Sequence, residues 1–367
     1  MKRKVRVGIL FGGRSAEHEV SLQSAKSIVD AIDQSKYEVT LIGVDKDGQW
    51  YLNDASTFLL NADSPKLIAL NKSTENVTLA TGASCGDLVS LRGSGSVAAL
   101  DVVFPVLHGP YGEDGSVQGL FKLANIAFVG SGILGAAVSM DKDVMKRLLA
   151  QAGLPTPKWR TINSASRERF SYSDIVDELG SPCFIKPANL GSSVGVAKVH
   201  NETTFKAAMH DAFRYDNKIL IEEFIDGHEV ECSVLGNEEP IASVPGEVVP
   251  AHEFYSYDAK YIDEKGAELR IPADLPKDVV EQVRDLAVRA FKVLCCDGMA
   301  RVDFFVTGGG KVYVNELNAI PGFTKISMYP KLWQASGIAY SELIDKLIQL
   351  ALERHQRDSK LKTNVEL

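Results

Sequence analysis

A stretch near the carboxyl end of the chain, residues 299–327, carries polar side chains at the spacing of a metal and phosphate site. Two runs rich in β-branched and aromatic residues flank a glycine-rich turn, which predicts a β-hairpin. Arg301 and Asp303 alternate with apolar residues in the first run, and Glu316 and Asn318 do so in the second. Each pair therefore lies on one face of its strand. If the strands pair, two carboxylates and an amide oxygen converge beside an arginine, a ligand set that suits Mg²⁺ and substrate phosphates.

The same pattern has a plainer interpretation, a solvated hairpin face whose charged residues need no function. Apolar residues flank each acid, and this favours the metal site. The loop that follows, residues 319–324, offers backbone N–H groups to a developing negative charge.

A second candidate is the glycine- and serine-rich segment 188–196, which lies between two predicted strands just after Lys186. Its amides and hydroxyls suit a lid over phosphates, with Lys186 as a point charge beneath it. The segment does not have the G-x-x-x-x-G-K-[ST] spacing of a Walker A loop. Taken alone, a glycine-serine hairpin is more often an ordinary turn.

Two further loops follow strands in the first third of the chain. The strand at 5–11 leads through a glycine turn into a helix, a junction where backbone amides bind ligands. Glu17 lies in that turn, although acids are also common at a helix start without any function. His108 opens a second glycine-rich loop, 108–115, at the carboxyl edge of a strand, where α/β folds bind ligands. A structural role for this histidine is an equal alternative.

The segment from Gly130 to Gly135 matches the G-x-G-x-x-G pattern of dinucleotide-binding folds. That fingerprint also requires an acid about 20 residues further on, at the end of a second strand. Here a predicted helix, 142–152, occupies that region instead. We therefore reject a nicotinamide site.

Composition excludes several classes of protein. The chain has 367 residues, 40 Lys and Arg against 48 Asp and Glu, and a net charge of −8, which argues against a nucleic-acid-binding surface. No apolar run approaches the roughly 18–20 residues of a membrane span. The basic start and short apolar run at 1–13 resemble a signal peptide but have no cleavage site, and they are better interpreted as a first strand. Five cysteines without CxxC spacing indicate reduced thiols in the cytoplasm.

Strands and helices alternate along most of the chain, which predicts a mixed α/β protein of two or three domains. Strands are expected at 5–11, 39–44, 101–107, 126–129, 159–161, 183–186, 218–223, from 229 to 250, and in the hairpin. Helices are expected from about 15 to 32 and at 142–152, 172–179, 202–214, 277–294 and 339–354. The polar region 53–97 is expected to be an irregular excursion, and the aromatic-rich loop 252–265 an active-site flap.

Eight segments in order resemble the D-alanine–D-alanine ligase family of the ATP-grasp superfamily. They are GGRSAEHEVS, LHGPYGEDG, SMDK, FIKPANLGSSVGV, LIEEFIDGHE, FYSYDAKY, MARVDFF and NELNAIPGFT. The resemblance runs from about residue 4 to 352, and the polar insert after Asn53 is similar to the longer-chain branch of the family.

The resemblance implies an α/β (α+β) three-domain ATP-grasp fold with a Rossmann-like βαβ start. The implied domains are an amino-terminal substrate domain (1–138), a central ATP-grasp part (139–227) and a carboxyl-terminal part with the metal and catalytic residues (228–367). ATP phosphorylates one D-alanine, and a second D-alanine displaces phosphate to give a dipeptide for peptidoglycan synthesis. The family implies ATP as co-substrate, two Mg²⁺ or Mn²⁺ ions, no nucleic-acid or membrane partner, and a cytoplasmic homodimer.

Residue roles are implied by the matching motifs. The nucleotide-binding set is Lys142, Lys186, Ser193, Glu222, Glu223, Ile225, Glu229 and Lys260. The metal ligands are Asp303, Glu316 and Asn318, which two ions share. The catalytic set is Glu17, Ser192, Tyr261, Arg301 and Gly322, and substrate contacts are His108 and Ser327. In this scheme Glu17 holds the first D-alanine's ammonium, Arg301 and the Gly322 amide stabilise the oxyanion, and Ser327 contacts the second D-alanine. One departure is Glu223, where some relatives carry a lysine.

Three other functions compete with this one. A D-alanine–D-lactate ligase is the nearest, but such relatives do not have the segment Tyr257-Asp258-Ala259-Lys260-Tyr261, which is intact here. A catalytically inactive scaffold would have lost Arg301 or a metal ligand, and neither is missing. The dehydrogenase interpretation rests on the glycines from 130 to 135 alone.

Overall fold

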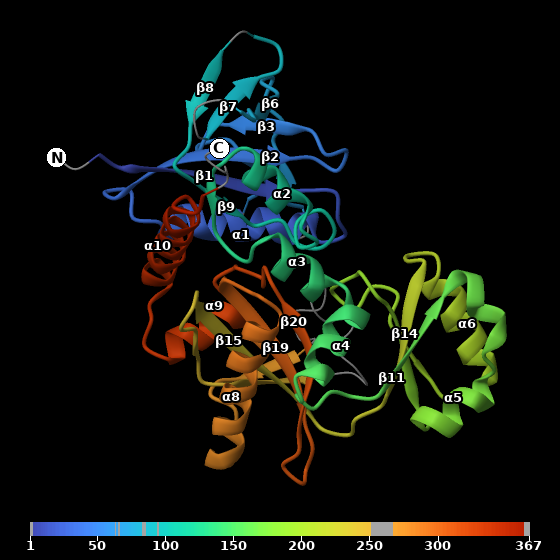
Figure 1. The fold of residues 1–367 in the computed structure, drawn as a ribbon. Coiled ribbons are helices and arrows are strands. Elements are labelled where there is room, and N and C mark those ends of the chain that lie inside the picture. The colour runs from blue at the N-terminus through green and yellow to red at the C-terminus, as the bar shows by residue number, and fades with distance from the viewer. Residues whose placement is uncertain are drawn as a thin grey trace.

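The structure is a computed structural model that describes residues 3–62, 64, 67–82, 86–93, 95–250 and 267–362. Three main β-sheets follow one another along the chain, each with its own helices (Figure 1). This confirms the predicted mixed α/β class. The predicted flap at 252–265, with Lys260 and Tyr261, lies outside the described residues, as does Cys85. The four described cysteines are free thiols, as expected.

The first sheet has the strand order β10-β9-β1-β2-β3, parallel except for its edge strand β3. Its central strands are near-continuous apolar runs, as expected for strands that are buried on both faces. Residues of α1 and α10 pack with these strands in one apolar core, and residues of α2, β6 and β7 do so in another. Its strands and helices are β1 (Val5–Gly12), α1 (His18–Ala31), β2 (Tyr37–Val44), β3 (Trp50–Asn53), β9 (Val102–Pro105), α2 (Ser116–Leu123) and β10 (Ala127–Phe128). The predicted irregular excursion forms two small sheets from β4 (Leu59–Leu60), β5 (Ala69–Leu70), β6 (Val77–Leu79), β7 (Asp87–Ser90) and β8 (Ser96–Ala99).

The G-x-G-x-x-G segment connects the first sheet to the next part of the chain. Gly132 caps α3 (Ile133–Met140), a helix that was not predicted. At Gly135 a Cβ would overlap the carbonyl oxygen of Cys295, so this glycine permits close helix packing. Helix α4 (Lys142–Gln151) follows at once, with the Asp141 side chain accepting from two of its first backbone N–H groups. The chain therefore enters a second helix rather than a second strand, in agreement with rejection of the nicotinamide site.

The second sheet is antiparallel, with the order β11-β14-β12-β13. Helices α5 and α6 cover the same sheet at the far end of the molecule in Figure 1. Its elements are β11 (Trp159–Asn163), the 3-10 helix η1 (Ser164–Arg169), α5 (Tyr172–Leu179), β12 (Cys183–Pro187), β13 (Ala197–Val199), α6 (Glu202–Ala212) and β14 (Lys218–Glu223). The glycine-serine segment connects β12 to β13, as predicted.

The third sheet carries the predicted hairpin. Its order is β18-β17-β15-β19-β20, with β16 paired to β15, and α8 packs against it. Its elements are β15 (His228–Gly236), β16 (Ile241–Ala242), β17 (Gly246–Pro250), β18 (Ala267–Arg270), α8 (Lys277–Val293), β19 (Gly298–Val306), β20 (Val312–Asn318) and α9 (Met328–Ala335).

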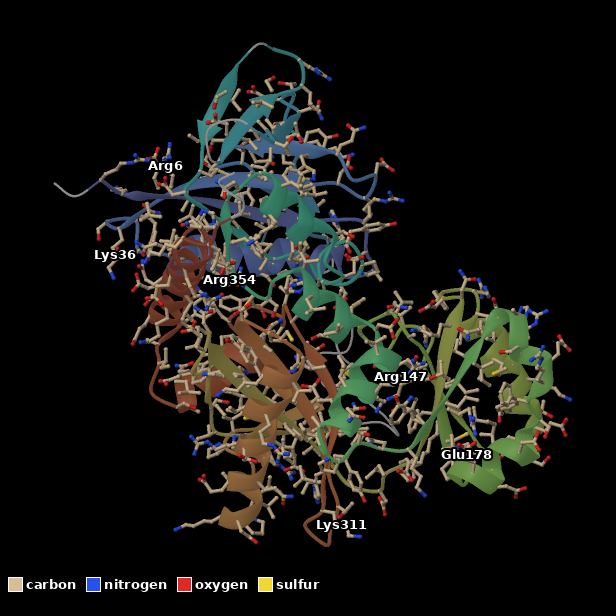
Figure 2. The ribbon with its side chains drawn as sticks, in the orientation of Figure 1. Arg6, Lys36, Arg147, Glu178, Lys311 and Arg354 are labelled. Atoms are coloured by element: carbon tan, nitrogen blue, oxygen red, sulfur yellow. The ribbon has the colours of Figure 1, made fainter. Side chains whose placement is uncertain are left out.

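Helix α10 (Tyr340–Asp358) joins the first and third sheets. One apolar core contains Phe11 of β1 together with Trp333 of α9 and Leu347 of α10. Arg354 of α10 donates to the Phe128 carbonyl at 2.8 Å and pairs with Asp297 at 3.4 Å (Figure 2). Burial of this guanidinium is compensated because all these partners are anionic or carbonyl oxygens. Arg354 thereby connects β10 of the first sheet to the residue just before β19 of the third sheet.

Candidate active site

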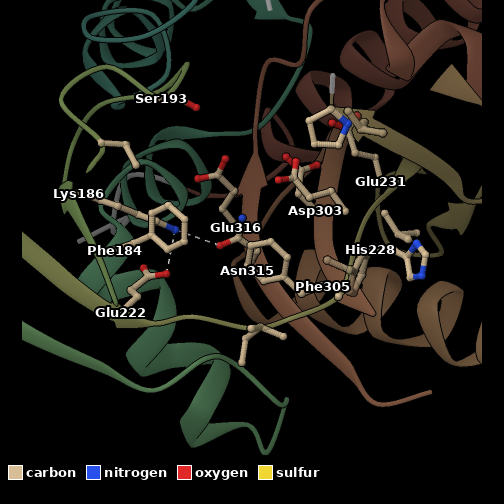
Figure 3. Close-up of a pocket in the computed structure, with 18 of the residues that line it drawn as sticks. Phe184, Lys186, Ser193, Glu222, His228, Glu231, Asp303, Phe305, Asn315 and Glu316 are labelled. Carbon is tan, nitrogen blue, oxygen red and sulfur yellow. Dashed lines mark hydrogen bonds and ion pairs between the residues drawn. The ribbon is translucent and has the colours of Figure 1, made fainter. Parts of the chain in front are cut away.

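A cavity of about 360 Å³ lies between the second and third sheets. Figure 3 shows Phe184, Lys186 and Glu222 on one side and Asp303, Glu316 and Glu231 on the other. Ser193 belongs to the glycine-serine loop above it. The predicted residues that line the cavity are Lys142, Lys186, Ser192, Ser193, Glu222, Glu223, Ile225, Glu229, Asp303 and Glu316.

The hairpin register brings the predicted metal ligands together. Asp303 of β19 lies opposite Glu316 of β20, and Arg301 lies opposite Asn318. The Arg301 guanidinium donates from Nε and Nη2 to the two Asp303 oxygens, at 2.7 Å each. Asn318 Nδ2 donates to Asp303 Oδ2 at 2.9 Å. The prediction that these four side chains converge is confirmed.

A β-bulge between Asp303 and Phe304 adds a residue to this wall that the sequence did not suggest. Because of the bulge, Asn315 has no partner in the ladder register, and its Oδ1 lies 3.3 Å from Lys186 Nζ. Bulges redirect side chains next to functional sites. Asn315 therefore connects the third sheet to the second across the cavity.

Lysines from the central part of the chain supply positive charge to the cavity. Lys142 Nζ lies 3.4 Å from Glu316 Oε2 and donates to the Leu190 carbonyl at 2.6 Å. Lys186 Nζ donates to Glu222 Oε2 at 2.8 Å. Burial lowers the pKa of Lys186, but Glu222 and Glu316 outweigh it and raise that pKa above its ordinary value. Lys186 is therefore positioned to meet an anionic ligand as a cation.

Lys146 is a functional candidate that the sequence analysis missed. It is fully buried on α4, one turn after Lys142, and its Nζ lies 3.4 Å from Glu222 Oε1. Burial acts to raise the pKa of Glu222, but Lys146 and Lys186 hold that pKa below its ordinary value. Glu222 thus stays ionised between two lysines. The i, i+4 spacing of Lys142 and Lys146 on one helix face was the available signal.

Two aromatic rings on the second sheet were also missed. Phe184 and Phe224 line the cavity with ring centroids 6.2 Å apart, and Lys198 Nζ lies 4.4 Å from the centre of the Phe224 ring. Flat apolar rings of this kind suit a heterocyclic base. Glu223, next to Phe224, accepts a hydrogen bond from the Lys158 backbone N–H at 2.7 Å.

The glycine-serine loop contacts the first sheet. Ser192 Oγ donates to Glu17 Oε1, and both serines of this loop have positive φ, 52° at Ser192 and 58° at Ser193. Such strained backbone occurs often at ligand-binding loops. The hydrogen bond from Ser192 to Glu17 joins the glycine-serine loop to the turn that follows β1.

The first sheet also holds the loop that follows the hairpin. His108 is buried, and its Nδ1 lies 3.0 Å from the Ile320 carbonyl oxygen. Glu113, which the sequence analysis missed, accepts hydrogen bonds from the Ile320 N–H at 2.9 Å and the Gly109 N–H at 2.8 Å. The signal was its position in the glycine-rich loop that His108 opens. His108 and Glu113 together hold both polar groups of one peptide residue.

Only part of the loop 319–324 offers free amides. The N–H groups of Ile320, Phe323 and Thr324 donate to Glu113, Ser24 and Ser327 respectively. Across the described parts of the chain, no partner engages the Gly322 N–H. The Gly322 N–H is therefore available to the predicted oxyanion. Ser327 Oγ lies 2.7 Å from Thr324 Oγ1 at the same turn.

Glu113 should make stability depend on pH. Burial, followed by the nearby Glu17 charge, raises the pKa of Glu113 from 4.5 to about 8. The folded state therefore binds this proton more tightly, and its contribution to the unfolding free energy falls as pH rises from about 4.5 to about 8. In Glu113→Gln this loss is absent. Between pH 5 and 8 the Tm of the variant should therefore fall by about 2 °C less than the Tm of the wild type, or by a still smaller amount. Thermal unfolding monitored across this range tests the difference.

The comparison uses the slope of Tm against pH rather than the Tm values themselves. Glutamine has one acceptor oxygen for two N–H donors, so the variant is less stable than the wild type at every pH. Glu281→Gln, at an exposed position on α8, is the matched control and should keep the wild-type slope. Parallel slopes for wild type and Glu113→Gln would contradict the assignment.

The donor chemistry at the hairpin fits a divalent cation. Asp303 and Glu316 face each other on neighbouring strands, and Asn318 can add an amide oxygen. Oxygen ligands of this kind suit Mg²⁺ or Mn²⁺. In the part of the chain that the structure describes, no cluster of three His, Cys, Asp or Glu side chains is arranged to hold a metal. The residues present thus fit a cation that takes part of its coordination from a bound phosphate.

No helix among the described residues combines the length and the apolar character needed to cross a membrane.

Comparisons with known proteins identify the family of this chain. The family described as D-ala D-ala ligase N-terminus matches residues 6–131, and D-ala D-ala ligase C-terminus matches residues 148–349. A D-alanine–D-alanine ligase of Shouchella clausii (strain KSM-K16) is 59% identical over 362 residues, which cover 99% of this chain and 98% of that protein.

Solved structures show the same similarity over the whole chain. The D-alanine–D-alanine ligase from Coxiella burnetii is 40% identical with a TM-score of 0.84, covering 97% of this chain and 96% of that one. The VanG D-Ala:D-Ser ligase from Enterococcus faecalis is 35% identical with a TM-score of 0.83, covering 95% of this chain and 100% of that one.

Proposed function

This chain belongs to the D-alanine–D-alanine ligase family, and we propose that it joins two D-alanine molecules at the expense of ATP. The mixed α/β fold expected from the resemblance is confirmed by its similarity to solved ligases of the ATP-grasp type. The observation that carries the proposal is the hairpin, where Asp303 faces Glu316 and Arg301 faces Asn318 beside a cavity that also holds Lys142 and Lys186.

The nucleotide occupies the cavity between the second and third sheets. Its base lies by Phe184 and Phe224, near the segment that contains Glu222, Glu223 and Ile225, and its ribose lies by Glu229. The lysines Lys142 and Lys186, together with Ser193, bind phosphates, and Lys260 of the flap joins them. For the described residues, the cavity lining and the lysines on one of its sides support this arrangement.

Asp303, Glu316 and Asn318 would hold two divalent cations, Mg²⁺ or Mn²⁺, which when bound would neutralise charge on the transferring phosphoryl group. Phosphoryl transfer needs in-line positioning and electrostatic stabilisation more than covalent participation by the protein. The carboxylate oxygen of the first D-alanine attacks the terminal phosphorus of ATP, the bond to the bridging oxygen breaks, and D-alanyl phosphate and ADP result.

The first D-alanine binds where the first sheet meets the lid. Glu17 holds its ammonium group. Ser192 of the lid and Tyr261 of the flap are hydrogen-bonding partners of Glu17, and His108 lines this end of the site. The hydrogen bond from Ser192 to Glu17 supports this role because it fixes the carboxylate at the boundary of the cavity.

The second D-alanine attacks as a neutral amine, with its carboxylate near Ser327. Attack on the acyl carbon forms a tetrahedral oxyanion, and expulsion of inorganic phosphate leaves the peptide bond. Arg301 and the Gly322 N–H stabilise this oxyanion. Among the loop amides from Ile320 to Thr324, the Gly322 N–H is the one without a partner in the described chain, which supports this assignment.

The wider setting follows from the family. The product serves peptidoglycan precursor synthesis in the cytoplasm, and the enzyme acts as a homodimer. The proposed parts of the chain are a substrate domain at 1–138, a central part at 139–227 and a carboxyl-terminal part at 228–367.

The experiment measures ADP and phosphate release with MgATP and D-alanine, and identifies the product by mass spectrometry. Parallel reactions contain L-alanine, D-alanine with D-lactate, and D-alanine with D-serine. We expect turnover with D-alanine alone and a D-alanyl-D-alanine product, and no turnover with L-alanine. The D-serine arm matters because the VanG relative is a D-Ala:D-Ser ligase. Turnover that required D-lactate or D-serine would overturn the dipeptide assignment.

A further inference from the structure

Three carboxylates form a row across three neighbouring strands of the third sheet. Glu231 of β15 lies opposite Asp303 of β19, and Asp303 lies opposite Glu316 of β20. All three line the same cavity (Figure 3). Like charges directly opposite one another on paired strands destabilise a sheet. A row of this kind therefore needs cations, and it points to a function beyond folding.

Arg301 connects two members of the row. Its Nε lies 2.8 Å from Glu231 Oε2, and its Nε and Nη2 each donate to an Asp303 oxygen at 2.7 Å. The third acid, Glu316, has Lys142 as its cation at 3.4 Å. The planar guanidinium presents several N–H groups in a fixed fork, so it can contact two carboxylates at once. The compact ammonium of a lysine does not have this geometry.

Both oxygens of Asp303 accept hydrogen bonds from protein donors. Arg301 contacts both of its oxygens, and Asn318 Nδ2 donates to Oδ2 as well. Oδ2 accepts two hydrogen bonds, from Arg301 Nη2 and Asn318 Nδ2, so it can ligate a cation only by giving up at least one of them. If Asp303 were the sole carboxylate partner of Arg301, loss of the bond to Oδ2 would weaken the pairing of a largely buried guanidinium, which is 18% exposed.

We propose that Glu231 is a positioning residue that keeps Arg301 in place when Asp303 turns to the divalent cation. The proposal rests on the proposed function and deepens it. Glu231 holds Arg301 from β15, on the side away from Glu316, so Arg301 keeps one carboxylate throughout. Glu231 thereby lowers the cost of metal binding by Asp303 and fixes the guanidinium for the oxyanion.

Glu231 acts outside the metal shell. Its side chain is 10% exposed, against 25% for Glu316. Within the described residues, the three acids of the row do not form a group that holds one metal ion. Outer-shell partners of metal ligands typically change metal affinity or activity by about 10- to 100-fold when they are removed.

The test is Glu231→Gln, which keeps the size of the side chain and removes its charge. Mn²⁺ binding is measured by electron paramagnetic resonance with a non-hydrolysable ATP analogue present, so the main readout does not depend on turnover. We expect Mn²⁺ affinity to fall roughly 10-fold or more. In the full reaction, kcat should fall by a similar factor while the KM for ATP at excess Mg²⁺ changes little.

The matched control is Glu247→Gln. Glu247 is a buried acid of the neighbouring strand β17 that lines the same cavity, but it pairs with His228 and Arg270 rather than with Arg301. It controls for the loss of one negative charge near a cation site, and its Mn²⁺ affinity should stay close to that of the wild type. Equal losses in the two variants would overturn the proposal.

A double-mutant cycle separates positioning from a structural role. If Glu231 acts through Arg301, Glu231→Gln should add little to the loss already caused by Arg301→Lys. Additive losses, or a lower Tm with unchanged Mn²⁺ affinity, would contradict the proposal. Should Glu231→Gln fail to fold, Glu231→Asp keeps the charge, and its Mn²⁺ affinity must then exceed that of Glu231→Ala.

The proposed function and this inference fail separately. A wild-type protein that binds Mn²⁺ and the nucleotide analogue but does not ligate D-alanine would refute the substrate and leave the Mn²⁺ comparison valid. Ligation of D-alanine with Mn²⁺ affinity unchanged in Glu231→Gln would refute only the role of Glu231.

Discussion

Replacing Glu316 with alanine is expected to lower kcat by at least about a thousandfold, because the phosphoryl group then loses electrostatic stabilisation that the site supplies in advance. Glu316 faces Asp303 across the hairpin, and its carboxylate is paired with Lys142. The fold should survive, since the side chain is 25% exposed and Lys142 keeps its hydrogen bond to the Leu190 carbonyl. Steady-state ADP release, measured over a range of Mg²⁺ concentrations, gives the effect.

Glu281→Ala, which removes an exposed acid from α8, serves as the control and should leave kcat within twofold or so of the wild type. Far-UV circular dichroism and the Tm of both variants exclude unfolding as the cause. A Glu316→Ala enzyme that turns over at a near-normal rate in saturating Mg²⁺ would remove this residue from the metal site.

The geometry of the hairpin was predictable because a two-residue period fixes which side chains share a face. Arg301 and Asp303 on one strand, and Glu316 and Asn318 on the other, can converge only if the strands pair in the observed register. The bulge at Asp303 was not predictable, since no glycine or other local signal marks it. The sequence therefore gave no indication that Asn315 lies in the site.

Residues whose role depends on a distant partner were the ones missed. Lys146, Glu113 and Glu231 gain significance from Glu222, Ile320 and Arg301, which lie far away in sequence. Each gave a weak local signal, such as the two-residue spacing of Glu229 and Glu231 on one strand. A period can assign a side chain to a face, but it cannot say which strand or loop that face meets.

Short helices were missed for a different reason. Helices α2, α3 and α9 each have eight residues. Periodicity becomes informative over windows of about 11–18 residues, so an eight-residue helix gives few repeats. Helix α5 has the same length and was predicted, so length alone did not decide the outcome. In α3 the glycines at its start suggested a nucleotide loop, whereas the packing of Gly135 against Cys295 explains at least one of them.

Arg301→Lys is expected to lower kcat roughly 100- to 1,000-fold, although the positive charge is kept. The guanidinium contacts Glu231 and both Asp303 oxygens at the same time, with distances of 2.7–2.8 Å. A single ammonium cannot make all of these contacts at once. It therefore cannot keep the position from which, in the proposed mechanism, Arg301 stabilises the oxyanion together with the Gly322 N–H. The KM for ATP should change only a few-fold, because Arg301 is not among the residues that line the nucleotide cavity.

The measurement determines kcat and KM for ATP and for D-alanine in the coupled ADP assay, with Arg284→Lys as the control. Arg284 lies on α8, where it donates to the Ala242 carbonyl of β16 at 3.2 Å, so its replacement tests the general cost of exchanging arginine for lysine beside the same sheet. A kcat within a few-fold of wild type for Arg301→Lys would mean that charge alone suffices. The shared ion pair with Glu231 and Asp303 would then serve folding rather than catalysis. A large loss in kcat with a normal Tm would place the geometry of the guanidinium, and not its charge, at the centre of oxyanion stabilisation.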